Sequence, residues 1–286
     1  MRIDVECIPC FARQAISTTR RSTDNPAIEW EVMRRISKFI AELSPESTPP
    51  DFAANVYAVI AELTGVEDPF KSQKDEANKL AMAVVAELGN GIEDFPDPLL
   101  AAVKLSIAGN SMDLGVISEF GDVGDLARRV METDLGVDDY GELLARLKTA
   151  RDVLIIGDNT GEIVFDRVLI ERMRRINHCP YTYMVRGRPV INDVTMQDAK
   201  DVGIDGVAEV VDTGSGTPGL VLSTCSEDAC ERFTNADLVI SKGQGNYEAL
   251  SDAPREVFFL LLAKCDVVSR ELQAPVGSAI VKRHLP

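Results

Sequence analysis

Apolar residues recur at three- and four-residue steps through the first half of the chain, and this spacing predicts amphipathic helices. One such stripe consists of Ile28, Val32, Ile36, Ile40 and Leu43. It follows Asn25, a favourable N-cap residue, and Pro26, whose missing N–H costs nothing at the first position of a helix. The stripe therefore predicts a helix that begins near residue 26.

Three further helices are predicted before residue 110. One begins near Pro50, carries an apolar face and stops at Gly65. The next ends at Gly89, and another runs from about Asp97 to Ala108. No strand-like alternation occurs before residue 150, so we expect the first half of the chain to be entirely helical.

From Arg151 the pattern changes to short, β-branched apolar runs that are separated by loops and helical stretches. Strands that alternate with helices around a parallel sheet have this pattern. The expected strands are 153–156, 181–185, 207–211, 238–240 and 257–263, with Ile280 and Val281 as a short last strand. The sequence thus predicts an α/β protein, with a three-layer α/β/α domain and a mainly parallel sheet over residues 149–286. An all-helical N-terminal region over residues 1–148 precedes it.

Composition narrows the function classes. The 286 residues carry 46 acidic and 30 basic side chains, a formal net charge of −16 that repels polyanions, so we expect no nucleic-acid partner. The longest apolar run, 257–263, is far below the roughly 20 residues that span a membrane. Residues 1–10 lack the pattern of a signal peptide. We therefore expect a soluble, cytoplasmic protein with no membrane association.

A polar turn follows the first expected strand, where Gly157 precedes Asp158, Asn159 and Glu162. Side chains beyond the carboxyl ends of parallel strands converge on one crevice, so this turn is a candidate for metal binding. The alternative is an ordinary helix cap, because the same residue types cap helices and Glu162 could complete a capping box with Asn159.

A second polar turn contains Asp193, which follows the strand expected at 181–185. This residue could also be only a helix cap. Two acidic turns at one sheet edge would repel each other unless a cation lies between them. The chain has only two histidines, so the ligands would be mainly oxygen atoms, which suit Mg²⁺ or Mn²⁺.

A third polar turn, after the strand expected at 238–240, contains Lys242, Gly243 and Gly245. The lysine supplies a positive charge, and the glycines allow backbone N–H groups to approach an anion closely. A simple tight turn is the alternative, because neither complete nucleotide-binding glycine pattern is present. Together, the three turns contain the groups needed to hold and polarise a phosphoryl group.

The blocks GDNTGEIVFD, RGRPVINDVT, ADLVISKGQGNYEAL and LLLAKCDVV resemble those of the damage-control phosphatase family, long known only as a domain of unknown function. The resemblance extends to an early CxxCxxRQ block at residues 7–14 and to residues 108–113. The spacing resembles that of the short archaeal and bacterial branch of the family.

The resemblance implies a helical N-terminal region packed on an α/β/α domain, and metal-dependent hydrolysis of small phosphorylated metabolites. It implies metal ligands at Asp158, Asn159 and Asp193, with Mg²⁺, Mn²⁺, Co²⁺ or Ni²⁺ as the divalent ion. It also implies a phosphate contact at Lys242, a substrate contact at Glu162, and pocket-closing residues on the helical side at Asn110 and Asp113. From the glycine-containing turn itself we add Gly243 as a substrate-binding residue.

Our hypothesis is a phosphatase that acts on sugar phosphates or on phosphates of damaged cofactors and metabolites. Asp158, Asp193 and Lys242 are its expected catalytic residues. Direct attack by water is preferred over a covalent role for Asp158, because phosphatases of the covalent type have a second aspartate where this chain has Thr160. The rival is a non-catalytic protein that binds metal and metabolite in the same crevice. The sequence is also compatible with a homo-oligomer.

The cysteines offer a second candidate metal site. Cys7 and Cys10 form a CxxC pair, and Cys225 and Cys230 form a looser one. The four thiols could hold a structural zinc ion or act as redox pairs. The alternative is that CxxC is only a feature of a helix start and that the thiols are ordinary buried groups.

Overall fold

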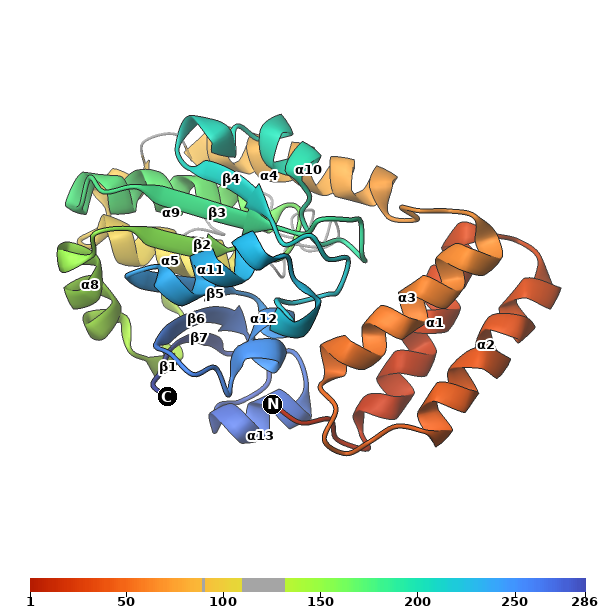
Figure 1. Cartoon of the computed structure of the whole chain (residues 1–286). Coiled ribbons are helices and arrows are strands. Elements are labelled where there is room, and N and C mark those ends of the chain that lie inside the picture. Colours follow the sequence, from red (N-terminus) through yellow and green to blue (C-terminus); the bar gives the residue numbers. More distant parts are fainter. Residues whose placement is uncertain (89–90, 110–131) are drawn as a thin grey trace.

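The computed structural model describes residues 1–88, 91–109 and 132–286. These residues form a seven-stranded sheet with helices on both faces and a helical bundle beside it (Figure 1). The predicted pocket-closing residues Asn110 and Asp113 lie outside the described residues.

The strands of the sheet follow the order β1-β7-β6-β5-β2-β3-β4. Every neighbouring pair is parallel except β6 and β7, which are antiparallel. The predicted α/β fold with a mainly parallel sheet is therefore confirmed. The strand bounds are β1 Leu135–Asp138, β2 Val153–Ile156, β3 Tyr181–Val185, β4 Glu209–Asp212, β5 Leu238–Lys242, β6 Val257–Leu262 and β7 Ala279–His284.

Helices cover both faces of this sheet. Along β2, Val153 and Ile155 belong to one hydrophobic core, whereas Leu154 and Ile156 belong to another. Both faces of a parallel strand are thus buried, which explains its continuous apolar run. The first core is completed by α4 Lys71–Leu88, α5 Pro98–Ala108, α8 Tyr140–Thr149, α9 Glu162–Ile176 and α10 Met196–Asp201. The second is completed by α11 Glu227–Asn235, α12 Gln244–Leu250 and α13 Asp266–Leu272.

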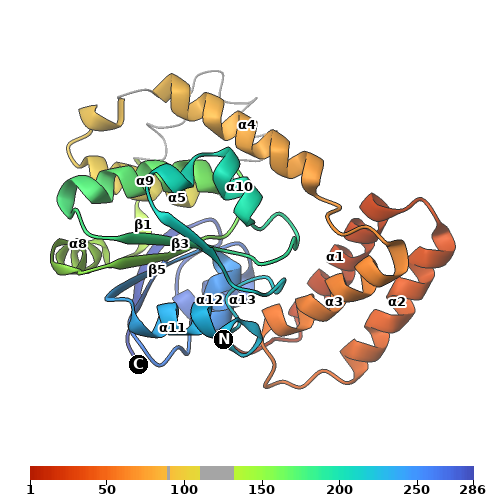
Figure 2. The same cartoon turned by 45° about the horizontal axis from the view of Figure 1, so that its top comes forward.

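The first three helices, α1 Cys7–Ser22, α2 Pro26–Ala41 and α3 Pro49–Thr64, form a bundle with a core of its own. The predicted start of α2 is confirmed, because the Asn25 side chain accepts a hydrogen bond from Ala27 N at 3.0 Å. Figures 1 and 2 show this bundle to one side of the α/β body, joined to it by the chain that leads into α4.

The expectation that no strand occurs before residue 150 is wrong. β1 lies at the edge of the sheet and pairs in parallel with β7. The last strand is also longer than the two predicted residues, because β7 pairs along its length with β6. A division of the chain after residue 148 stays a prediction.

Three short 3₁₀ turns complete the described elements, η1 Gly91–Asp94, η3 Ile204–Gly206 and η4 Leu222–Thr224. Among the described residues, none of the helices combines the length and apolar character that crossing a membrane requires.

Candidate active site

The turns after β2 and β3 bring three oxygen-bearing side chains together. Asn159 donates a hydrogen bond from Nδ2 to Asp158 Oδ2 at 2.5 Å. Asn159 also forms an isolated β-bridge with Asp193, and Val194 N donates to the Asp158 carbonyl at 2.8 Å. All three side chains are buried. The structure thus places the predicted metal ligands in one cluster.

The capping explanations of these turns are wrong. Helix α9 follows Gly161, which caps it without a side-chain hydrogen bond, so Asn159 and Glu162 form no capping box there. Helix α10 is capped by Thr195 and Asp198, because Asp198 Oδ2 accepts hydrogen bonds from Thr195 N and Oγ1 at 2.8 and 2.7 Å. Asp193 is therefore free of a capping role.

The turn after β5 approaches this cluster through Gly243. Its φ angle of 77° is one that side chains other than glycine rarely adopt. A Cβ atom at this position would lie 1.9 Å from Asp158 Oδ2. Only glycine therefore fits beside the Asp158 carboxylate, and the third predicted turn adjoins the first.

Arg186, at the end of β3, is a site residue that the sequence analysis did not identify. Its guanidinium is almost fully buried and donates from Nε to Asp193 Oδ2 at 2.7 Å. It also donates from Nη2 to Asn246 Oδ1 at 3.0 Å. Burial raises the pKa of Asp193 to about 7 although the Arg186 charge lowers it, and the nearby Asp158 charge raises it further.

Lys242 lies fully buried at the end of β5. Its Nζ donates hydrogen bonds to Glu162, to Asp166 Oδ1 at 2.7 Å and to the Ser106 carbonyl at 3.2 Å. An ammonium group has three donors, so all of them are engaged. Burial alone would lower the pKa of Lys242, but the charges of Asp166 and Glu162 raise it above its ordinary value. The lysine therefore stays charged.

Two acidic residues of α9 accompany this lysine. Asp166 also accepts hydrogen bonds from Ser106 Oγ at 2.6 Å and Tyr183 OH at 2.7 Å, so it is held from three sides. Glu162 is buried, and its Oε2 has no hydrogen-bond partner among the described residues. Burial raises the pKa of Glu162 to about 8, against the opposing effect of the Lys242 charge. Asp166 ends the predicted site segment GDNTGEIVFD, but the sequence analysis assigned it no role of its own.

The cluster of Asp158, Asn159 and Asp193 fits a hard divalent ion. Two carboxylates and an amide offer oxygen atoms only, and Mg²⁺ is held in proteins by one or two carboxylates together with phosphate and water. Among the described residues, no group of three or more histidine, cysteine, aspartate and glutamate side chains is arranged to hold a metal, so an ion here would need the Asn159 amide oxygen as its third side-chain ligand. The donor set therefore favours Mg²⁺ or Mn²⁺ over zinc.

The four thiols proposed for a zinc site are not gathered. Cys7 and Cys10 lie at the start of α1 in the bundle, whereas Cys225 and Cys230 lie at the start of α11 on the sheet. The Cys225 thiol donates to Val221 O at 3.2 Å, and the Cys230 thiol to Leu222 O at 3.4 Å. All described cysteines are free thiols. The structure gives a four-thiolate site no support because the two pairs belong to different layers.

The chain is similar to known proteins over nearly its whole length. Residues 3–280 match the model of the damage-control phosphatase ARMT1-like domain. The chain is 33% identical to a damage-control phosphatase of Pyrococcus horikoshii, and the match covers 99% of each chain. It is 31% identical to a damage-control phosphatase of Archaeoglobus fulgidus, also over 99% of each. The crystal structure of a DUF89 family protein from Pyrococcus horikoshii matches with a TM-score of 0.90, 32% identity and 99% coverage of both chains.

Proposed function

The chain belongs to the damage-control phosphatase family, and from that premise we propose that it is a metal-dependent hydrolase of phosphate esters of small metabolites. The observation that carries the proposal is the convergence of Asp158, Asn159 and Asp193 beside the buried Lys242. Oxygen ligands and a fixed positive charge are what phosphoryl transfer requires at one place.

In this proposal Asp158, Asn159 and Asp193 hold the divalent ion. When bound, such an ion withdraws charge from the phosphoryl oxygens. Arg186 orients Asp193 through its hydrogen bond at 2.7 Å. Gly243 has no Cβ atom and therefore leaves room for the Asp158 carboxylate. These residues therefore fix the ligands before a substrate arrives, so little reorganisation accompanies the reaction.

Lys242 is the proposed contact to the phosphate. Asp166 and the Ser106 carbonyl hold its ammonium group from one side, and Glu162 occupies its remaining donor. A phosphate oxygen can take the place of Glu162 while the other two bonds keep the lysine oriented. Glu162 would then turn its carboxyl group toward the substrate, consistent with the substrate contact expected at this position.

Direct attack by water is the proposed mechanism. In the alternative mechanism Asp158 becomes phosphorylated, which requires its carboxylate to move toward the phosphorus atom and attack it. Its Oδ2 already accepts a hydrogen bond from Asn159 and lies against Gly243. The close packing favours a fixed ligand over a nucleophile that moves.

The test measures phosphate release from a panel of sugar and cofactor phosphates with Mg²⁺, Mn²⁺, Co²⁺ or Ni²⁺. Asp158→Asn and Asp193→Asn should each lower kcat/KM by about 100-fold or more, because each removes a charged ligand without changing the shape of the side chain. Asp205→Asn, at an exposed acidic residue of η3, is the matched control and should remain active.

Phosphate release with none of the metals would refute the proposal. Binding of a phosphorylated metabolite without turnover would instead support the rival, a non-catalytic binding protein. Unchanged activity in Asp158→Asn would show that the cluster is not the active site.

A further inference from the structure

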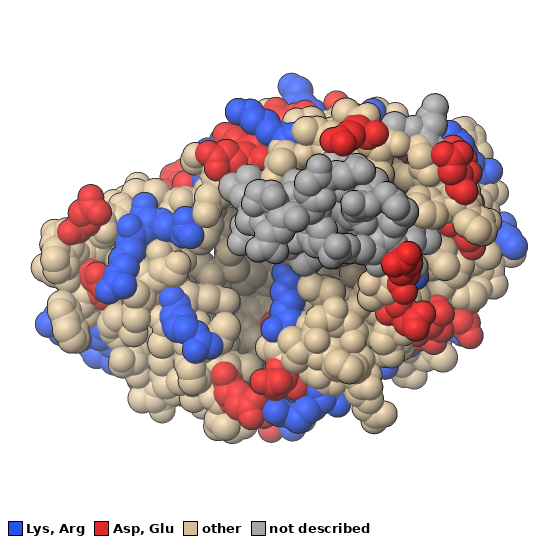
Figure 3. All heavy atoms as spheres, turned by 180° about the vertical axis from the view of Figure 1, so that it is seen from behind, with Lys and Arg blue, Asp and Glu red and all other residues tan. Residues whose placement is uncertain are grey.

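A cavity of about 570 Å³ lies between α3 and the loops that follow β3 and β4. Its walls include Tyr57 of α3, Phe70 before α4, Arg188 and Ile191 after β3, and Thr217 after β4. A volume of this size accommodates a small metabolite. Figure 3 shows the molecule hollowed between the helical bundle and the α/β body, with basic side chains on both sides of the hollow.

This cavity adjoins the candidate active site. Val190 and Ile191 line it, and Asp193 N donates a hydrogen bond to Val190 O at 3.0 Å. Ile191 has a φ angle of 45°, a costly conformation for a β-branched residue, and strain of this kind is concentrated at functional sites. A phosphate bound next to Asp193 would therefore place the rest of its molecule in the cavity.

Arg188 supplies positive charge on the α/β side of the cavity. Its side chain is exposed and packs on Gly216, where an added Cβ would lie 3.2 Å from Arg188 Cβ. The opposite rim is formed by α1, whose Thr18 lines the cavity. One turn further on, the Arg21 guanidinium lies 5.3 Å from the ring centre of Phe70, which also lines the cavity.

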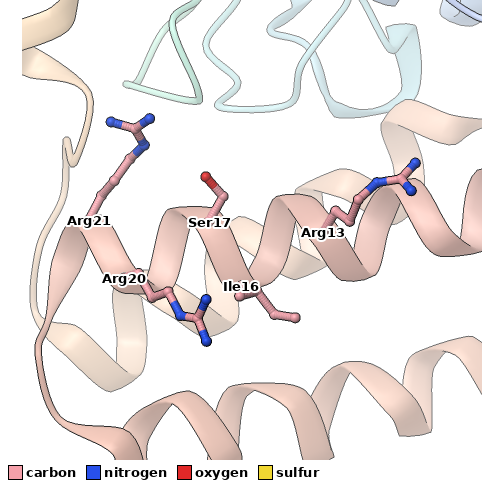
Figure 4. Close-up of a pocket in the computed structure, with 5 residues that line it drawn as sticks. All are labelled: Arg13, Ile16, Ser17, Arg20 and Arg21. Carbon is pink, nitrogen blue, oxygen red and sulfur yellow. The ribbon is translucent and has the colours of Figure 1, made fainter.

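Figure 4 shows how the side chains of α1 divide between two directions. Arg21 and Ser17 point toward the loops of the α/β body, whereas Arg20 points away from them. Arg20 forms an ion pair with Glu29 of α2. In the part of the chain that the structure describes, neither Arg21 nor Arg188 forms an ion pair. Two uncompensated cations thus flank one cavity of a protein whose net charge is −16.

The acidic residues of the same cavity do not cancel this charge. Asp68 is paired with the buried Lys74 at 3.3 Å, which leaves the exposed Glu67 as the acidic group on the rim. Cations at the mouth of a cleft attract anionic ligands and raise their local concentration.

We infer that the cavity binds the alcohol part of the substrate, which hydrolysis separates from the phosphate. We also infer that Arg188 and Arg21 bind a second anionic group on this alcohol part. The substrate class is then a phosphate ester that also carries a carboxylate or a second phosphate. This inference rests on the proposed function for the phosphate that is hydrolysed, but the anion subsite is tested separately.

The experiment compares two matched pairs of compounds, glucose 6-phosphate with 6-phosphogluconate and fructose 6-phosphate with fructose 1,6-bisphosphate. Calorimetry with EDTA gives dissociation constants without metal-dependent turnover, and phosphate release with Mn²⁺ gives KM. The wild type should bind the member with the extra anionic group more tightly in each pair. That preference should weaken as salt is added, because the arginines are exposed.

Arg188→Gln and Arg21→Gln should each weaken binding of the compounds with the extra anionic group by about tenfold, and should leave the other member of each pair unchanged. Arg20→Gln is the matched control on the same helix and should change neither. Glu67→Gln should act in the opposite direction, with roughly twofold tighter binding of the compounds with the extra charge.

Equal binding of both members of each pair by the wild type would overturn the inference. So would Arg188→Gln and Arg21→Gln variants that weaken both members equally. If the charge preference and its loss are observed in EDTA but no phosphate is released with any metal, the anion subsite stands and the proposed phosphatase function fails.

Discussion

Gly243→Ala is the substitution for which the structure makes its sharpest prediction. The added Cβ would lie 1.9 Å from Asp158 Oδ2 and 2.2 Å from Asp158 Cγ. The backbone cannot easily retreat, because Gly243 N donates a hydrogen bond to Leu260 O at 3.0 Å. The Asp158 side chain must therefore move out of its place among the proposed metal ligands.

The cost has two parts. Placing alanine at a φ angle of 77° costs roughly 1–3 kcal/mol of backbone strain, and overpacking against Asp158 costs about 1–3 kcal/mol more. We therefore expect Gly243→Ala to lower the free energy of unfolding by about 2–6 kcal/mol. If Asp158 is a metal ligand as proposed, phosphate release should fall by about 100-fold or more, because the displaced carboxylate no longer reaches the ion.

Gly245→Ala is the matched control, two residues further along the same turn. The nearest atom to its added Cβ would be Gly219 N at 3.8 Å, an ordinary contact. Since Gly245 lies within α12, alanine should stabilise the helix by up to about 1 kcal/mol. Urea unfolding and phosphate release are measured on both variants.

A double-mutant cycle separates the clash from the backbone strain. In an Asp158→Ala background, Gly243→Ala should cost less stability than in the wild type, because the carboxylate that it meets is gone. Equal costs in both backgrounds, or a Gly243→Ala variant as active and stable as Gly245→Ala, would refute the reasoning.

Three further predictions concern buried polar groups. Arg186→Met should lower stability by about 3–5 kcal/mol, because Asp193 loses its buried partner; thermal unfolding measures this loss, and Mn²⁺ should restore part of it. Burial raises the pKa of Glu248 to about 7, so this residue should contribute a loss of on the order of 3 kcal/mol at most as the pH rises from about 4.5 through 7, because the unfolded chain ionises first. The raised pKa values of Asp193 and Glu162 add losses of the same sign. In urea unfolding, Glu248→Gln should make the fall of stability with pH shallower by the Glu248 contribution. Asn78→Ala removes the acceptor of Gly161 N at 2.7 Å and should cost about 1–3 kcal/mol, whereas Asn78→Asp keeps an acceptor and should recover most of it in the same measurement.

The central strands could be predicted because strands buried on both faces consist of uninterrupted apolar residues. Both faces of β2 are covered by helices, so Val153–Ile156 is apolar at every position. The edge strand β1 has no such apolar run. It has four residues, only alternate ones are partly buried, and its partner β7 lies at the other end of the chain. Residues 135–138 form a strand because they pair with the distant β7, and the local sequence pattern does not show this pairing.

The candidate site divides in the same way. Asp158, Asn159, Asp193 and Lys242 could be proposed because each follows an apolar run. Arg186 could not, because a charged residue next to a strand is usually exposed, and only the folded chain shows it buried against Asp193.

The role of α9 also depends on tertiary contacts. An acidic residue in the first turn of a helix is an ordinary stabilising feature, so Glu162 had a sufficient local explanation. Its actual partner, Lys242, is 80 residues away. Asp166, one turn further along α9, looks like a solvent-facing residue until Lys242, Ser106 and Tyr183 are brought to it.

The buried charges agree with the proposed metal on grounds that do not depend on the family. Among the described residues, the site combines four carboxyl groups with two basic side chains, namely Asp158, Glu162, Asp166 and Asp193 against Arg186 and Lys242. Four formal negative charges and two positive ones leave an excess of two. Burying such an excess is costly unless it is neutralised. Without an ion, protons neutralise part of it, since the pKa values of Asp193 and Glu162 are raised to about 7 and about 8. A divalent cation would supply the same charge and allow both groups to ionise. In the proposed enzyme the two basic residues would therefore have a second role besides contacting the substrate: they would reduce the formal excess to what a single divalent ion can balance, beside the three proposed ligands.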